Sequence, residues 1–314
     1  MSADVDLRRL MTRAVAERRC DAILFSGGLD TSIVATLAKD RGLRLAVTVA
    51  VGQDPPDLSY AVSLARSLEV EHVVLRRTLD DLLASLPGLI RIIGSFDGMF
   101  LRNDVVVYEG LREIAARGHR SCWTGDGADE LFAGYSFMFE RSPAEIETTV
   151  RRFAATMRFN GPAIGRAFGV EVHSPFLHPG VVAHAAGLPG AAMVLERDGR
   201  RMGKAPLRLA FEGLLPDGHL FRRKDPVEVG SGATRLREHV AATVGDAFAA
   251  EAARILEEDR VRIRDAEHLA YYRLYCEVFG GPPRADPSLP KECPGCHARG
   301  PDGTYCRVCG AYPI

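Results

Sequence analysis

Residues 26–32, which read SGGLDTS, combine the residue types of an anion-binding turn with one carboxylate. The two glycines let the backbone curl so that several N–H groups point into one concavity, and the following helix adds its positive end. Asp30 would repel a bound phosphate unless a divalent cation lay between them, so the segment predicts Mg²⁺ as well as a phosphate. It is not a Walker loop, because no lysine lies in the turn; a capped strand-to-helix turn without a ligand is the alternative. The residues expected to line this site are Ser26, Gly27, Gly28, Asp30, Thr31 and Ser32.

A second glycine-rich segment, TGDGADELFAGY at residues 124–135, follows the same logic. Its glycines permit close approach of the backbone to a ligand, and Thr124 and Gly125 open the turn. Asp126, Asp129 and Glu130 place three carboxylates within five residues, and this clustering is costly unless a metal or a catalytic role requires it. The alternative is a capped, solvated helix start.

The C-terminal segment 293–314 contains a different motif, CPGC followed after nine residues by CRVCG. Paired Cys-x-x-Cys turns with trailing glycines orient thiolates toward one centre and favour a tetrahedral site. Because four thiolates leave no open coordination position, we expect a structural Zn²⁺ and not a catalytic metal. A redox role is less favoured, because both pairs lie in a loop-rich tail and not at a helix start. The expected zinc ligands are Cys293, Cys296, Cys306 and Cys309.

The other three cysteines, Cys20, Cys122 and Cys276, are scattered along the chain, and we expect them to be inert. An odd total of seven with one paired metal motif indicates a reducing compartment, so we expect a cytoplasmic protein. The N-terminus has no apolar core of a signal peptide, and no apolar run approaches the length of a membrane span. Lys and Arg (40) balance Asp and Glu (41), so charge gives no reason to expect nucleic acid as a partner, although a local patch is not excluded.

Short apolar strands alternate with helices from the N-terminus to about Glu140, and this pattern predicts parallel βαβ units. Both glycine-rich segments follow an expected strand directly. Because ligands of such sheets lie at the carboxyl ends of the strands, we expect the two segments to meet at one edge. The expected strands are 22–25, 43–51, 72–75 and 120–124, and the expected helices are 6–18, 31–39, 58–68 and 105–116.

The later chain changes in character. A mostly helical stretch carries loops around 160–179 and 213–232, and a proline-rich segment without periodicity follows it. The expected organisation is therefore an α/β core at 1–142, a helical part at 143–280, a linker at 281–292 and a zinc ribbon at 293–314.

The two glycine-rich segments together resemble the synthetase domain of asparagine synthetases and their β-lactam and carbapenam synthetase relatives, within the N-type ATP pyrophosphatases. SGGLDTS alone would also suit argininosuccinate synthetase, but GADELF argues against that family. The resemblance spans about residues 20–280. Further segments that resemble the family are FLRN at 100–103, GVEVHSPFL at 169–177, GKAPLR at 203–208 and the LP…RRK segment at 215–224.

The resemblance implies a parallel-sheet ATP pyrophosphatase core and an AMP-forming amide synthetase. A substrate carboxylate would attack the α-phosphate of ATP, and ammonia or an amine would then displace AMP from the acyl-adenylate. By the same resemblance, Asp30 and Asp129 would hold Mg²⁺. Lys224 would neutralise the leaving pyrophosphate with Lys204 nearby, and Asp126 would act at the acyl-adenylate. Val49 and Gly52 would cradle the adenosine.

The chain departs from the family pattern at several points. Asp126 stands where asparagine synthetases usually have Glu, and His173 and His178 replace the usual Arg and Asp beside PFL. The first loop already begins at Ser26, so we expect no glutaminase domain before it. Nitrogen would then come from free ammonia, an amine substrate or a separate glutaminase subunit, with a carrier protein as another candidate partner. Aspartate is one candidate acid among others.

Two other functions remain open. The first is a sulfur-transfer or tRNA-modifying ATP pyrophosphatase, because zinc ribbons accompany some of those enzymes. The second is a non-catalytic module that binds a partner through its ribbon. The resemblance of GADELFAGY to the amide-forming branch argues against the first, and the acidic and lysine positions at the loops argue against the second.

Overall fold

A computed structural model describes residues 3–222, 226–284, 288–300 and 304–314. The chain forms two compact units, each assembled from three segments. The first unit comprises Met1–Thr48, Pro56–Leu75 and Gly110–Pro226, and the second comprises Val49–Pro55, Arg76–Glu109 and Val227–Ile314. The boundaries expected at residues 142, 280 and 292 stay predictions.

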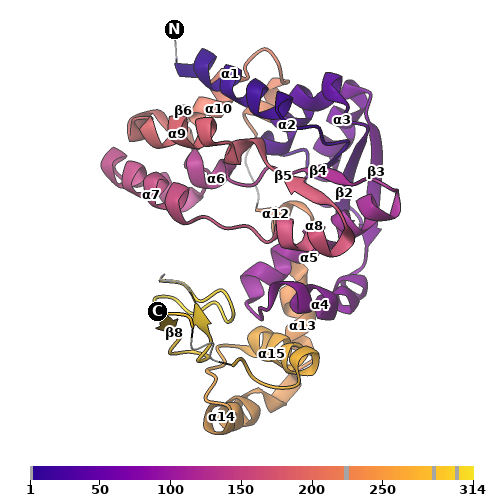
Figure 1. Cartoon of the computed structure of the whole chain (residues 1–314), viewed down its shortest axis with the longest axis vertical. Coiled ribbons are helices and arrows are strands. Elements are labelled where there is room, and N and C mark those ends of the chain that lie inside the picture. The colour runs from indigo at the N-terminus through magenta and orange to yellow at the C-terminus, as the bar shows by residue number, and fades with distance from the viewer. Residues whose placement is uncertain (1–2, 223–225, 285–287, 301–303) are drawn as a thin grey trace. The chain divides into compact units, whose positions relative to one another are not determined.

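A five-stranded sheet has the order β3-β2-β1-β4-β5 (Figure 1). β1 pairs in parallel with β2 and β4, and β4 pairs in parallel with β5, which confirms the expected α/β class. The fifth strand lies where the sequence predicted only a loop. The strands are β1 (Ala22–Leu24), β2 (Leu45–Val51), β3 (Glu71–Arg77), β4 (Ser121–Trp123) and β5 (Glu171–His173).

The chain order of the strands reverses at β1. It runs outward from β1 to β2 and β3 on one side and then returns to β4 and β5 on the other. The junction of β1 and β4 is therefore a topological switch point, where parallel α/β sheets open a crevice for ligands. Both glycine-rich segments begin at this junction, directly after β1 and β4.

Helices of the first unit surround this sheet. α1 packs against α2, α9 and α10 and presents Leu7, Met11 and Val15, all fully buried, to the core. Their spacing of about four residues places them on one helical face. The helices of this unit are α1 (Ala3–Ala16), α2 (Leu29–Ala38), α3 (Leu58–Leu68), α6 (Ala128–Leu131), α7 (Pro143–Thr156), α8 (Gly161–Phe168), α9 (Pro179–Gly187), α10 (Ala205–Ala210) and α11 (Asp217–Leu220), with the hairpin β6 (Leu195–Arg197) and β7 (Arg200–Met202).

The second unit has its own apolar core, in which α15 packs against α4 and α13 (Figure 1). Thr78 and Asp81 begin α4 with a reciprocal capping box, and Gly94 ends it in a left-handed conformation. The helices are α4 (Leu79–Ile93), α5 (Gly98–Ala116, which continues into the first unit), α12 (Val227–Gly230), α13 (Leu236–Ala242), α14 (Phe248–Glu258) and α15 (Ala266–Phe279), with a terminal hairpin of β8 (Lys291–Glu292) and β9 (Arg299–Gly300).

Within the described ranges, no single helix is both long and apolar enough to cross a membrane. α4 and α5 reach that length and composition only as a pair bent by 104°.

The buried face of α1 gives a test of the fold. Leu7→Ala should lower the free energy of unfolding by about 2–5 kcal/mol, because it leaves a cavity in the core. Val5 lies on the same helix with 55% of its surface exposed, so Val5→Ala should change stability by less than about 0.5 kcal/mol. Urea unfolding followed by circular dichroism measures both variants; equal losses would contradict the placement of α1.

Candidate functional site

The two glycine-rich loops are in direct contact. β1 and β4 pair with Ile23 opposite Trp123, so the loops leave the sheet side by side. A Cβ atom at Gly125 would lie 2.9 Å from the Cβ of Asp30 and 3.4 Å from Cγ2 of Thr31. Gly125 therefore permits the second loop to pack on the first.

The first loop is fixed by its own backbone and hydroxyls. Gly27 has a left-handed φ of +69°, and a Cβ there would lie 2.3 Å from the backbone nitrogen of Ala61 in α3. The Gly28 N–H donates to Ser26 Oγ at 3.1 Å, and Ser26 Oγ lies 3.2 Å from Thr31 Oγ1. Ser32 Oγ is buried and has no hydrogen-bond partner among the described residues. The expected cluster of hydroxyls and backbone donors is thus present.

A buried lysine joins the two loops. Lys204 Nζ lies 2.7 and 2.6 Å from the two carboxylate oxygens of Asp30 and 2.9 Å from Asp129 Oδ1. Only 1% of Lys204 is exposed, and its backbone N–H donates to the Phe132 carbonyl at 2.8 Å. The structure therefore brings together three of the residues that the sequence assigned to catalysis and metal binding.

Close packing around this lysine explains a glycine of the second loop. A Cβ atom at Gly134 would lie 1.9 Å from Asp129 Oδ1 and 2.5 Å from Lys204 Cε. Lys204 itself adopts a left-handed φ of +60°, a conformation that non-glycine residues rarely hold. The tight turn before α10 thus aims the ammonium at the two carboxylates.

The charges at the site shift proton affinities. Burial lowers the pKa of Lys204, and the Asp30 carboxylate opposes that shift. Burial raises the pKa of Asp126 to about 6, with the nearby charges of Glu130 and Asp30 adding to the effect. Thr124 Oγ1 donates to Asp126 at 3.0 Å and opposes the rise. Asp126 can therefore take up or release a proton close to neutral pH.

Sequence reasoning missed a second buried cation near the first loop. Arg222 pairs with Asp57 at 2.7 Å, its guanidinium lies 4.3 Å from the centre of the Tyr60 ring, and Nη2 lies 3.5 Å from where a Cβ at Gly28 would be. Arg222 lies in the basic run FRRKD at residues 221–225. Apart from its resemblance to the family's RxK segment, such a run is typical of a solvated surface. The detectable signal was the arginine of the RxK segment, two residues before Lys224.

A second arginine, in the GKAPLR segment, has a structural role. Arg208 is buried and donates to the carbonyls of Gly203 and Leu220. These bonds fix the turn before Lys204 to the end of α11.

Three predicted site residues are not part of this cluster as described. Lys224 lies outside the described residues. Val49 is buried within β2, and Gly52, with φ +80°, follows that strand; both belong to the second unit. Their expected contact with adenosine stays a prediction.

The two histidines that depart from the family pattern have local partners. His178 accepts from the Gly180 N–H at the start of α9 and lies 3.0 Å from Glu17. His173 pairs with Glu171 at 3.0 Å on β5. Both side chains therefore serve the local structure.

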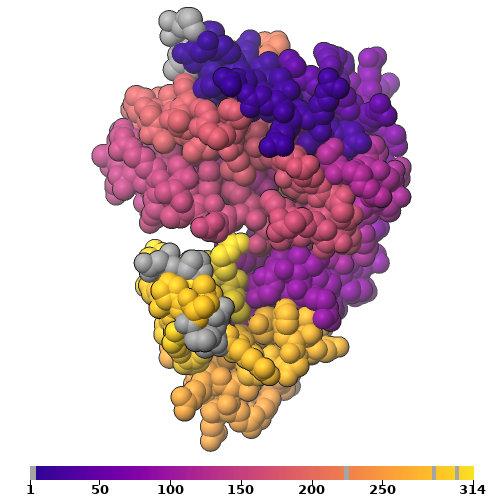
Figure 2. All heavy atoms as spheres, in the orientation of Figure 1, coloured from indigo at the N-terminus to yellow at the C-terminus, as the bar shows by residue number. Residues whose placement is uncertain are grey.

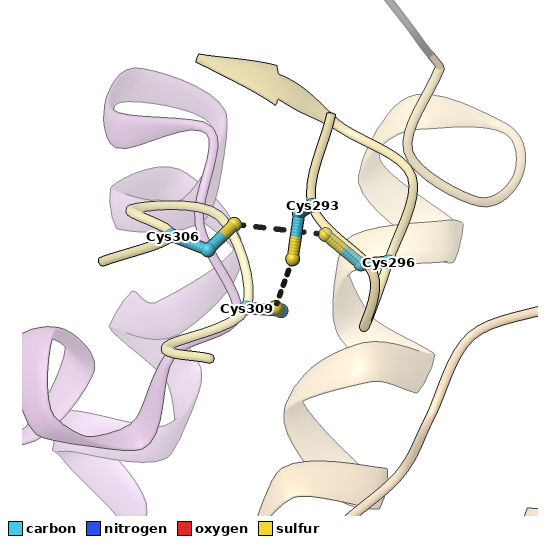
Figure 3. A group of neighbouring side chains, drawn as sticks. All are labelled: Cys293, Cys296, Cys306 and Cys309. Carbon is cyan, nitrogen blue, oxygen red and sulfur yellow. Dashed lines mark hydrogen bonds between the residues drawn. The ribbon is translucent and has the colours of Figure 1, made fainter. Parts of the chain in front are cut away.

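The four cysteines of the terminal motif converge on one centre (Figure 3). All are buried, and their Sγ atoms lie within 4.8 Å of one another, with 3.7 Å between Cys293 and Cys309 and between Cys296 and Cys306. A Zn–S bond of about 2.3 Å places tetrahedral sulfurs about 3.8 Å apart, so these separations fit zinc. His297 instead pairs with Glu292 at 2.7 Å and is not part of the cluster.

Two glycine-rich loops at the switch point of a parallel sheet, joined by a buried lysine, define an α/β nucleotide-binding protein of the ATP pyrophosphatase class. The family model described as asparagine synthase matches residues 6–161 and 150–277, and the chain belongs to that family. This confirms the expected family.

Curated relatives are similar over most of this chain. It is 27% identical over 300 residues to the glutamine-hydrolysing asparagine synthetase 1 of Arabidopsis thaliana, covering 87% of this chain and 51% of that protein. The match to the enzyme of Brassica oleracea is also 27% over 299 residues, covering 88% and 50%. The chain thus spans about half the length of these relatives. A solved NMN synthetase from Francisella tularensis is 14% identical, and the match covers 92% of this chain and 100% of that chain. Its TM-score of 0.40 is too low to support any inference about this chain.

The raised pKa of Asp126 predicts how stability depends on pH. Because the folded value of about 6 exceeds the ordinary 3.8, the folded chain holds this proton more tightly than the unfolded chain. The resulting stabilisation is full below pH 4 and is lost as the pH rises through 6. Asp126→Asn should therefore gain stability relative to the parent between pH 4 and 7, by at most about 3 kcal/mol.

The control for this experiment is Asp40→Asn, which changes an exposed carboxylate in the same way. Urea unfolding at pH 4, 5.5 and 7 should show a constant difference between Asp40→Asn and the parent. A constant difference for Asp126→Asn as well would show that its carboxyl is not perturbed.

Proposed function

We propose that this chain is an AMP-forming amide synthetase, which adenylates a small carboxylic acid with ATP and transfers the acyl group to ammonia or an amine. The observation that carries the proposal is the buried Lys204 ammonium held between Asp30 and Asp129 at the junction of the two loops. This arrangement places a cation, two carboxylates suited to Mg²⁺ and backbone donors where pyrophosphate would leave.

In the first step, a carboxylate oxygen of the acid would bond to the α-phosphorus of ATP, and the bond from that phosphorus to pyrophosphate would break. The N–H groups and hydroxyls of the first loop would bind the departing pyrophosphate, with Lys204 and Lys224 as cations. Arg222 is a further cation for this end of the nucleotide, because it lies beside Gly28. In the second step, the amine nitrogen would attack the acyl carbon, and AMP would leave.

The donor set at the junction suits Mg²⁺. The carboxylates of Asp30 and Asp129 converge on the point that the Lys204 ammonium occupies, and Mg²⁺ in phosphate sites takes one or two carboxylates together with phosphate oxygens. When bound, the ion would neutralise charge on the pyrophosphate. Lys204 would remain beside both carboxylates and keep them oriented.

Asp126 suits proton transfer at the acyl-adenylate. Its pKa of about 6 lets it accept a proton from the incoming amine near neutral pH. The acid that is adenylated, aspartate included, and the source of nitrogen are not fixed by these residues. Free ammonia, an amine, or ammonia from a separate glutaminase subunit would all suit this chemistry.

ATP–pyrophosphate exchange tests the proposal. With Mg²⁺ and a panel of carboxylic acids that includes aspartate, exchange should depend on one acid. Lys204→Met should lower the exchange rate by at least about 100-fold, because it removes a cation aimed at developing charge. Lys39→Met, which alters a lysine in the short helical turn after α2, should leave the rate unchanged.

Absence of exchange with every acid, despite measurable ATP binding, would contradict adenylation of a small molecule. A Lys204→Met rate equal to that of Lys39→Met would contradict the assignment of the site.

The alternative of sulfur transfer has less support. Cys122 lies in β4 and Cys20 lies shortly before β1, and both are buried. Burial raises the pKa of Cys20 to about 12 and that of Cys122 well above its ordinary value, so neither thiol would form the reactive thiolate.

We further propose that the cysteine cluster holds a structural Zn²⁺, which would replace the missing apolar core of the segment 293–314. The protein should bind a single zinc ion per chain in elemental analysis. Cys306→Ser should lower the zinc affinity at least about tenfold, whereas Cys276→Ser, on α15, should retain the full zinc content. Equal zinc content in both variants would contradict the ligand assignment.

A further inference from the structure

The cysteine motif is part of the second unit and packs against other segments of that unit. The second Cys-x-x-Cys turn, residues 306–310, packs on the loop 95–97 between α4 and α5. The Phe96 N–H donates to the Val308 carbonyl at 2.8 Å, and Ser95 Oγ donates to the same carbonyl at 3.1 Å. In Figure 2 the yellow spheres of the C-terminal segment adjoin the purple spheres of the segment that contains α4 and α5.

Side chains complete this contact around the buried Asp97. The Tyr305 hydroxyl donates to Asp97, and Arg264 donates to the Cys309 carbonyl at 2.7 Å while its Nη2 lies 3.6 Å from Asp97. A Cβ atom at Gly310 would lie 2.3 Å from Asp97 Oδ1. The turn that carries two of the metal ligands is therefore fitted to this carboxylate without space for a further methyl group.

Three further contacts extend the interface. The Tyr305 ring meets Phe100 edge-on with 5.8 Å between centroids, and the Arg307 guanidinium lies 4.6 Å above Phe100. From the first Cys-x-x-Cys turn, the Gly295 carbonyl accepts from the Arg262 N–H at 2.8 Å. Both cysteine turns therefore contact other segments of the second unit, the first through its backbone and the second through its backbone and side chains.

The loop that the ribbon holds begins α5. Asp97 accepts from the Met99 N–H at 3.3 Å in the first turn of that helix. Arg102, one turn further on, donates to Glu228 and Glu267 at 2.6 Å each. These three side chains are no more than 19% exposed, so the ion pairs depend on exact placement of the helix.

Glu228 connects this helix to the end of β2. Glu228 belongs to α12, and Ser231 is the first residue after α12. The Ser231 carbonyl accepts a hydrogen bond from the Val51 N–H at 2.8 Å. A Cβ at Gly232 would lie 2.4 Å from the Val51 carbonyl. Val51 is the last residue of β2, and Gly52 after it is expected to contact the nucleoside.

We propose that the metal-loaded ribbon is a positioning element for nucleotide binding, which acts through Asp97, Arg102 and Glu228 on the end of β2. The inference rests on the proposed function for its nucleotide. Metal ligation would hold the turn 306–310 rigid. The Val308 carbonyl would then keep its hydrogen bonds from Ser95 and Phe96, and the Cys309 carbonyl would keep its hydrogen bond from Arg264. A ribbon without metal would release the loop 95–97, then the first turn of α5, and then α12. The occupant of this face of the ribbon is the chain itself.

Two variants of the full-length, zinc-loaded protein, each compared with a control variant, separate docking of the ribbon from metal binding. Tyr305→Phe removes only the hydroxyl that bonds Asp97, and Tyr312→Phe makes the same change at a ribbon tyrosine that is 68% exposed. Gly310→Ala drives a methyl group into Asp97 and also strains a turn residue with φ +76°. Gly300→Ala adds a methyl group where nothing lies within 4 Å and φ is not left-handed.

Three measurements report on each variant: zinc content, hydrogen–deuterium exchange of amides 98–104 and 227–232, and ATP affinity by calorimetry. Tyr305→Phe should retain its zinc, exchange faster in both segments and bind ATP at least about fivefold more weakly. Gly310→Ala should show the same changes or larger ones. Tyr312→Phe and Gly300→Ala should match the parent.

Unchanged exchange at 227–232 and unchanged ATP affinity in both docking variants would overturn the proposal, as would equal effects in the two controls. The exchange measurement needs no acid substrate and no turnover. A chain that fails to adenylate any acid would therefore refute the proposed function, while the exchange data would still show whether the ribbon and α12 are coupled.

Discussion

The ion pairs of the buried Lys204 ammonium with Asp30 and Asp129 are the interaction on which the site in the first unit depends. A lone charge removed from water is costly, and here one cation is compensated by two carboxylates from different loops. The loops could not approach so closely if Gly125 carried a side chain, because Asp30 occupies that space. A side chain at Gly134 would collide with Asp129 of its own loop and with Lys204. The sheet brings the loops together, and the lysine makes their approach favourable. Charge and packing therefore specify the same geometry.

Much of this geometry could be predicted from residue types. Strands of apolar residues followed by glycine-rich turns predicted parallel pairing and a common edge, and the pairing of β1 with β4 confirmed it. The cysteine spacing predicted four converging thiols, because short Cys-x-x-Cys turns leave the backbone few other conformations. In both cases the information is local, and short-range geometry is what sequence patterns encode best.

What escaped prediction depends on partners distant in sequence. β5 reads Glu-Val-His with Glu171 exposed, so it lacks the buried apolar run that marked the equally short β1, and its partner β4 lies far away in the sequence. Arg222 is indistinguishable from its neighbours in FRRKD until Asp57 and Tyr60, which come far earlier in the chain, are placed beside it. The cysteine spacing likewise does not predict that the ribbon contacts Asp97, which lies 208 residues before Tyr305. The ion pair of Lys204 with both acidic loops likewise arises only when α10 is folded against them.

The contact between Ser95 and Val308 has a consequence for the order in which the protein is made. These residues are 213 positions apart, so the loop before α5 is synthesised long before its partner. At roughly 5–20 residues per second, translation would leave that loop uncovered for about 10–40 seconds. During this interval the loop would lack the acceptors that the last cysteines supply, and it would be open to chaperones and proteases. With the proposed zinc site, completion of the second unit awaits synthesis of both cysteine turns and the arrival of a metal ion.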